Sequence, residues 1–287
     1  MPARFPDTTF LTQPATAEPQ PESDAAPSCR LLVAKPGGRA VWALGSHYIL
    51  KDRGYYPGSE IEVQNTNFAA EQTEGPVAKI VVHWKEDNRF FLVQERIDGE
   101  PLEDALPKLT QDDIAHIGRQ MHDYLDQLRH ITSPQMQMLD GRPVIDRRLL
   151  KPLPAPTSTP YTVCTSQAEL AANMALAIKD RIDDEATLDK LMARMPNAIP
   201  FTFTHSDVHE GNIMVKDENF VGLIDWELAG FYPRWWEFVN SCEVLSDSLQ
   251  PSALERDALE WFRVYHAIRD GSGGEETAQM LDKYLSD

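Results

Sequence analysis

The pattern of apolar and polar residues predicts a first part of the chain built from strands and one helix. Residues 29–52 contain three short apolar runs separated by tight turns, which is typical of an antiparallel meander. Residues 57–73 begin with Pro-Gly and continue with apolar positions near helical spacing, so a helix is expected there. Two β-rich runs within residues 77–97 flank a polar turn at residues 85–88 and predict a hairpin.

After Gly99 the apolar spacing becomes that of helices. Residues 111–131 carry apolar side chains three or four positions apart, which predicts a helix with one buried face. Ser166 and Glu169 fit a capping box that would open a further helix. Residues 201–227 are the exception, because they contain short β-rich runs around polar loops. We therefore predict an α+β fold with a strand-rich lobe followed by a larger, mostly helical lobe. The expected divisions are residues 1–28, 29–98 and 99–287.

Composition and charge narrow the classes of function. Residues 1–28 are rich in proline, threonine and acids and have no hydrophobic period, so we expect a disordered tail. The chain has 45 acidic against 27 basic residues, a net charge of −18, which disfavours a nucleic-acid binder. Its three cysteines are scattered, which disfavours a disulfide scaffold or a zinc site. No apolar run suits a membrane span or a secretory signal. We expect a cytoplasmic monomer that binds neither nucleic acid nor membrane.

Candidate chemistry is concentrated between His205 and Glu227. Two β-rich runs there flank a polar turn at residues 216–219. If the hairpin folds about this turn, Asn212 and Asp225 lie at the same end of the ribbon. An amide oxygen and a carboxylate placed together suit Mg²⁺, which prefers oxygen ligands. Asp207 precedes Asn212 by five residues and would face whatever the metal holds.

The order and spacing of these residues resemble a known family. The loop HSDVHEGN at 205–212, followed by IDWE at 224–227, resembles the catalytic segments of the protein-kinase-like fold. It is most similar to the aminoglycoside phosphotransferase and choline-kinase-like branch, and residues 224–239 resemble its fungal members. The resemblance implies a bilobal fold, with one helix beside a small antiparallel sheet and a larger helical lobe. It also implies that Asp207 is the catalytic base and that Asn212 and Asp225 hold Mg²⁺ against nucleotide phosphates.

The same resemblance assigns roles in the first lobe. Lys51, at the end of the third predicted strand, would contact the α and β phosphates. Its carboxylate partner would come from the following helix, where Glu60 and Glu62 are both candidates. We favour Glu62, although the family's position, counted without a gap, falls on Gln64.

The connection between the lobes would hold the nucleotide base. There the backbone near Gln94, Glu95 and Ile97 would form hydrogen bonds with adenine. No G-x-G-x-x-G loop is present, and residues 35–38 form the only glycine turn over the phosphates. This leaves GTP open beside ATP.

The sequence thus predicts an enzyme that transfers the γ-phosphate of ATP to a hydroxyl of a small molecule. If the surplus acids line the acceptor cleft, a cationic acceptor is favoured. One alternative is a pseudokinase or nucleotide-binding scaffold without transfer activity. A second is a metal hydrolase that uses His205, Asp207 and His209, although this leaves Asn212 and Asp225 without a role. A protein kinase is disfavoured, because the glycine-rich loop and the Asp-Phe-Gly motif are missing.

Overall fold

The computed structural model describes most of the chain after Pro27. The described ranges are 28–35, 37–146, 148–150, 162–182, 184–241, 243–245, 248–271 and 274–286. The tail expected at residues 1–28 lies outside these ranges except for Ser28.

The first part of the chain forms one antiparallel sheet of five strands in the order β1-β2-β3-β5-β4. Both the meander and the hairpin predicted from the sequence are present. The hairpin turn is confined to Asp87 and Asn88, whose φ angles of 44° and 61° suit a two-residue connection between twisted strands. The strands are β1 (Cys29–Lys35), β2 (Arg39–Leu44), β3 (Tyr48–Gly54), β4 (Ile80–Glu86) and β5 (Arg89–Glu95).

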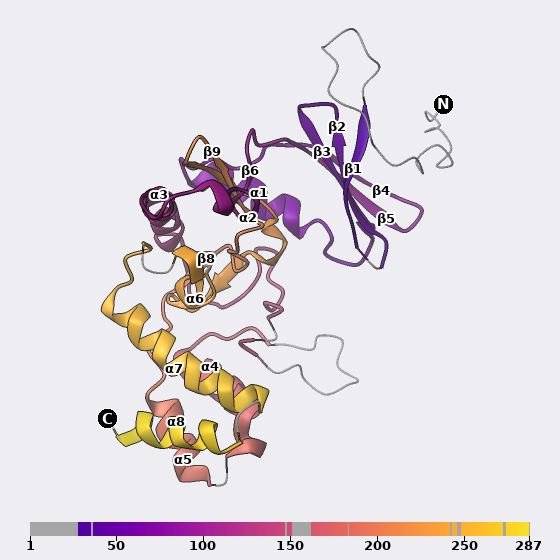
Figure 1. The fold of residues 1–287 in the computed structure, drawn as a ribbon. Coiled ribbons are helices and arrows are strands. Elements are labelled where there is room, and N and C mark those ends of the chain that lie inside the picture. Colours follow the sequence, from indigo (N-terminus) through magenta and orange to yellow (C-terminus); the bar gives the residue numbers. More distant parts are fainter. Residues whose placement is uncertain are drawn as a thin grey trace.

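Helix α1 (Ile61–Gln72) follows β3 in the chain and lies between this sheet and the rest of the molecule (Figure 1). On the expected inner face of this helix, Ile61, Asn65 and Ala69 are buried and Phe68 is partly buried. The Asn65 amide donates hydrogen bonds of 2.8 Å to the carbonyls of Trp226 and Ala229. Since a buried amide needs partners, Asn65 fixes α1 against the segment that follows the predicted metal ligand.

The second part of the chain is mostly helical and contains two sheets of three short strands, ordered β10-β9-β6 and β11-β8-β7. The helices α4, α5, α7 and α8 lie at the end of the molecule far from the first sheet (Figure 1). The remaining elements are β6 (Glu100–Pro101), α2 (Leu102–Ala105), η2 (Leu106–Lys108), α3 (Gln111–Arg129), β7 (Thr132–Ser133), α4 (Gln167–Ile178), η3 (Lys179–Arg181), α5 (Glu185–Ala193), β8 (Phe201–Thr204), β9 (Ile213–Lys216), β10 (Asn219–Leu223), η4 (Trp226–Leu228), β11 (Gly230–Tyr232), α6 (Trp236–Val239), η5 (Glu243–Leu245), α7 (Ala253–Asp270) and α8 (Gly274–Ser286).

The capping box expected at the start of α4 is only half formed. The Ser166 side chain accepts the N–H of Glu169, but the Glu169 carboxylate accepts from the N–H and hydroxyl of Thr165 instead of returning to Ser166. The prediction of a reciprocal pair was therefore wrong, because Thr165, one residue before Ser166, offers both its N–H and its hydroxyl to the Glu169 carboxylate. Full capping boxes occur at α3 and α7.

The core of the second part is rich in tryptophan. Trp235, Trp236 and Trp261 have no exposed surface, and Trp235 packs edge to face against both others. Aromatic rings of this size bury much apolar area, so this cluster fixes α6 against α7. Among the described helices, none is long and apolar enough to cross a membrane.

Candidate active site

The hairpin of β9 and β10 places the two predicted metal ligands at one end of a ribbon. Leu223 pairs with Ile213, and the N–H of Ile224 donates to the carbonyl of Asn212 at 3.0 Å. Asp225 follows immediately. The geometry therefore has the register that the sequence predicted.

Asp225 leaves the strand in a left-handed conformation, with φ of 68°. One of its carboxylate oxygens, Oδ1, lies 3.2 Å from Lys51 Nζ and 3.8 Å from Arg39 Nη2. Burial raises the pKa of this carboxyl, but the charges of Lys51 and Arg39 outweigh burial and lower the pKa to about 2. Asp225 is thus ionised at neutral pH, as a hard metal ligand must be.

Asn212 and Asp207 contact each other across the loop between β8 and β9. The Asn212 amide nitrogen donates to the Asp207 carbonyl at 3.0 Å and to its carboxylate at 3.3 Å. Since the amide nitrogen is used in this way, the amide oxygen of Asn212 is the atom that would bind a cation. The Asp207 side chain is 29% exposed, so a substrate can reach it.

His205 fixes the start of this loop as a neutral imidazole. Its Nδ1 accepts the N–H of Asp207 at 3.3 Å, and its Nε2 lies 3.0 Å from the carbonyl of Ile224. Nε2 must therefore carry the proton. Burial lowers the pKa of His205 to about 4, which agrees with this tautomer. With both nitrogens engaged, His205 braces the loop against the β9–β10 hairpin.

Ser206, beside Asp207, is held in a left-handed conformation with φ of 65°. The Trp236 indole donates to its hydroxyl at 3.0 Å, and the Asn240 amide donates to its carbonyl at 2.7 Å. The buried Glu237 carboxylate accepts the N–H groups of His205 and Ser206 at 2.6 and 3.0 Å. Burial raises the pKa of Glu237 to about 7, although both of these hydrogen bonds oppose the shift. Helix α6 thereby sets the backbone on which Asp207 sits.

Lys51 pairs with Glu62, and Glu60 is not its partner. Glu62 is 1% exposed, its Oε1 contacts Lys51 Nζ, and its Oε2 lies 3.1 Å from Arg53. Burial lowers the pKa of Lys51, but Glu62 and Asp225 raise it well above the usual value for lysine. Lys51 therefore stays protonated and brings a fixed positive charge into the cleft from β3.

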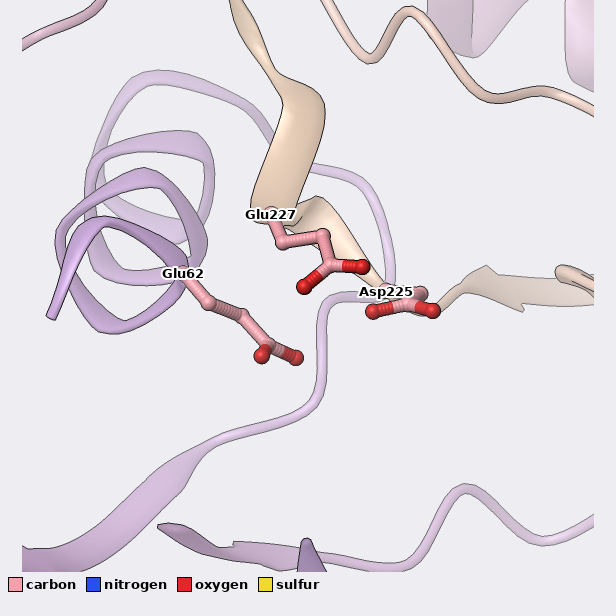
Figure 2. A group of neighbouring side chains, drawn as sticks. All are labelled: Glu62, Asp225 and Glu227. Carbon is pink, nitrogen blue, oxygen red and sulfur yellow. The ribbon is translucent and has the colours of Figure 1, made fainter. Parts of the chain in front are cut away.

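Three further charged residues, which the sequence analysis did not identify, complete this cluster. Arg53 contacts Glu227, and Arg39 donates to the other oxygen of Glu227 at 2.7 Å. The carboxylates of Glu62, Asp225 and Glu227 point toward one another (Figure 2), with ligand oxygens within 4.8 Å. Arginines and a lysine interleave with these acids, so the cluster is close to neutral.

A cleft of about 840 Å³ contains the predicted nucleotide-binding residues Lys51, Gln94 and Ile97 together with Asp207, Asn212 and Asp225. At the connection between the lobes, the N–H groups of Glu95 and Arg96 already donate to the carbonyls of Lys79 and His47. Neither of these two N–H groups is therefore free to donate to a purine base.

The metal-hydrolase alternative does not fit this geometry. His205 is fully buried with both ring nitrogens engaged, so it is not disposed as a metal ligand. His209 Nε2 lies 3.8 Å from Asp207, and its ring is 53% exposed. Within the described part of the chain, the one cluster of potential metal ligands is that of Glu62, Asp225 and Glu227.

Comparisons with known proteins identify a family for most of the chain. A family model described as "Phosphotransferase enzyme family" matches residues 39–270. A search of curated proteins found no match.

Solved structures of aminoglycoside phosphotransferases are similar over nearly the whole chain. A thermostable mutant of APH(4)-Ia with ADP and hygromycin B is 12% identical, with a TM-score of 0.56 over 90% of this chain and 93% of that chain. The streptomycin–ATP complex of APH(2")-IIa is 14% identical, with a TM-score of 0.55 over 91% of each chain. The gentamicin complex of APH(2")-IIa is 16% identical, with a TM-score of 0.53 over 90% of each chain. At these identities the matches establish the fold, and the predicted bilobal protein-kinase-like architecture is confirmed.

Proposed function

The chain belongs to the phosphotransferase enzyme family, and we propose that it transfers the γ-phosphate of ATP to a hydroxyl of a small-molecule acceptor in a Mg²⁺-dependent reaction. The observation that carries the proposal is the convergence of Asp207, Asn212, Asp225 and Lys51 on one cleft. Phosphoryl transfer depends mainly on positioning and on neutralising charge, and these side chains supply both.

In this proposal Asp207 is the base. Its exposed carboxylate accepts the proton of the acceptor hydroxyl, whose oxygen then forms a bond to the γ-phosphorus. The bond from phosphorus to the oxygen that bridges the β and γ phosphates breaks, and ADP leaves. Asn212, through its hydrogen bond to the Asp207 carboxylate, holds the base in position.

The donor set suits the metal and the nucleotide. The ionised carboxylate of Asp225 and the amide oxygen of Asn212 are hard oxygen donors that fit Mg²⁺, and the bound ion would neutralise phosphate charge. Lys51, held by Glu62, would contact the α and β phosphates. The N–H of Ile97 would donate to the purine, and a contact through the backbone leaves room for GTP as well as ATP.

A cationic acceptor is favoured by the acids beside the catalytic loop. The carboxylates of Glu103 and Asp104 are on the cleft wall with Asp207, and the net charge is −18. The similar solved structures contain hygromycin B, streptomycin or gentamicin. At 12–16% identity these names do not define the acceptor of this chain.

The test is a panel of amino-alcohols, aminoglycosides and sugars, in which ADP formation is measured with ATP and Mg²⁺. We expect turnover with at least one acceptor, and slow ATP hydrolysis without any. A protein that is stabilised by ATP and Mg²⁺ in a thermal shift, yet forms no ADP under any condition, would instead be a nucleotide-binding scaffold.

A further inference from the structure

Arg39 occupies a distinctive position at the phosphate end of the cleft. It is the first residue of β2 and follows Gly37 and Gly38, whose φ angles are 91° and 76°. It lines the main cleft and also a neighbouring cavity of about 510 Å³. Its side chain is therefore located where the glycine turn, β2 and the Asp225 segment meet.

We propose that Arg39 binds the terminal phosphates of the nucleotide and that Glu227 positions its guanidinium for this contact. This inference rests on the proposed function. The charge of Arg39 compensates for the missing glycine-rich loop. In such a loop, successive backbone N–H groups would surround the phosphates.

The distances support this assignment. Nη2 of Arg39 lies 2.7 Å from Glu227 and 3.8 Å from the Asp225 carboxylate. A small movement of the Arg39 guanidinium would thus bring it into contact with a phosphate held beside Asp225. Glu227 uses only Nη2 of Arg39. A guanidinium carries donors on all three nitrogens and can bind two phosphate oxygens at once, so Arg39 has further donors for a phosphate.

Burial distinguishes Arg39 from its neighbour Arg53. The Arg53 side chain is 7% exposed and contacts Glu227, Glu62 and the Ser59 carbonyl, so it acts as an internal brace. The Arg39 side chain is 37% exposed and faces open space. Of these two arginines on the cleft wall, Arg39 is the one that a ligand can recruit.

The balance of charges in the cluster favours a contact between Arg39 and the phosphates. Arg39, Lys51 and Arg53 face Glu62, Asp225 and Glu227, three cations against three acids. A nucleoside triphosphate adds several negative charges to this neutral cluster. Asp225 has a closer cation in Lys51, at 3.2 Å against 3.8 Å for Arg39. Because attraction falls with distance, Arg39 can turn toward the phosphates while Asp225 keeps its nearer partner.

The experiment is equilibrium binding of ATP, ADP and AMP, with and without Mg²⁺, to the full chain and to Arg39→Gln. Charge-assisted hydrogen bonds of this kind are worth about tenfold or more in affinity. We expect Arg39→Gln to weaken ATP binding by about tenfold, even in EDTA, and to leave AMP binding unchanged. Arg39→Lys should retain part of the affinity, and Glu227→Gln should fall between Arg39→Gln and the wild type.

Arg30→Gln is the matched control. Arg30 is an exposed residue on the neighbouring strand β1, so this variant removes the same charge from the same sheet and should bind all three nucleotides normally. The inference is overturned if Arg39→Gln binds ATP as the wild type does, or if ATP and AMP weaken equally, which would indicate a structural role. If the wild type binds ATP and forms ADP in either case, the proposed function survives. A wild type that binds no nucleotide overturns both.

Discussion

Ser206 gives a prediction whose magnitude can be worked out from two opposing effects. The residue has no exposed surface and a φ of 65°, a conformation that costs a non-glycine residue roughly 1–2 kcal/mol. Its hydroxyl accepts the hydrogen bond of the fully buried Trp236 indole. An alanine removes the hydroxyl but keeps the backbone cost, whereas a glycine removes both.

Ser206→Ala should therefore lower the free energy of unfolding by about 1–3 kcal/mol, the cost of a buried donor without a partner. Ser206→Gly loses the same hydrogen bond but relieves the backbone, so it should be more stable than Ser206→Ala by about 1 kcal/mol. Because Asp207 follows directly, the transfer rate should also fall further in Ser206→Ala than in Ser206→Gly.

Urea denaturation of the three proteins measures these differences, and equal m-values would show that the unfolded states are comparable. If Ser206→Ala is as stable as the wild type, the indole bond does not contribute as described. If the glycine variant is no more stable than the alanine variant, the left-handed conformation carries no cost, and the reasoning fails.

Three further predictions concern the charge cluster and the core. Glu62→Gln removes the buried negative charge that pairs with both Lys51 and Arg53 and should destabilise the fold by about 3–5 kcal/mol in urea denaturation, whereas Glu60→Gln should have little effect. Equal losses would contradict the pairing. Burial raises the pKa of Asp225, but Lys51 and Arg39 lower it from 3.8 to about 2. The ionised carboxylate therefore stabilises the fold above pH 4, and this stabilisation is lost as the pH falls toward 2. The stability advantage of wild type over Asp225→Asn should then shrink by about 2 kcal/mol in acid, and a constant difference from pH 5 to 2 would refute this. At Gly118 of α3, a Cβ would lie 2.2 Å from that of Ser248, so Gly118→Ala should lower the melting temperature, although the same change stabilises an open helix.

The sequence predicted those features that follow from local patterns. The turn at Asp217 and Glu218, both with positive φ, fixes the register of the β9–β10 hairpin, and that register alone brings Asn212 and Asp225 together. The spacing of the apolar residues in the two strands and the polar residues in the turn between them were sufficient for this inference.

Features that depend on contacts between distant residues were not predicted. Arg39 and Glu227 are 188 positions apart in the chain, and no local spacing connects them. The Glu237 carboxylate holds the backbone before Asp207 from 31 residues away, and no local pattern marks this glutamate as a partner of the loop. Such partners become visible only when α6 and the catalytic loop are placed together in space.

The pairing of Lys51 falls between these cases. Both Glu60 and Glu62 lie near the start of α1, and counting without a gap points to Gln64. The helix begins at Ile61, so Glu62 lies in its first turn, where it is buried against β3. The exact start of the helix, which sequence patterns define only loosely, decided which acid meets the lysine.

The central claim is that Asp207 serves as the base for phosphoryl transfer in this cleft. The most direct measurement is the transfer of labelled γ-phosphate from ATP by the wild type and by Asp207→Ala. Asp98→Ala is the control for loss of an acid, because the Asp98 side chain is 86% exposed near the connection between the lobes. We predict that the Asp207 variant binds ATP normally and transfers phosphate about 10²–10⁴-fold more slowly, while the control is unchanged. Equal rates in the wild type and Asp207→Ala, or no transfer by the wild type to any acceptor or to water, would contradict it.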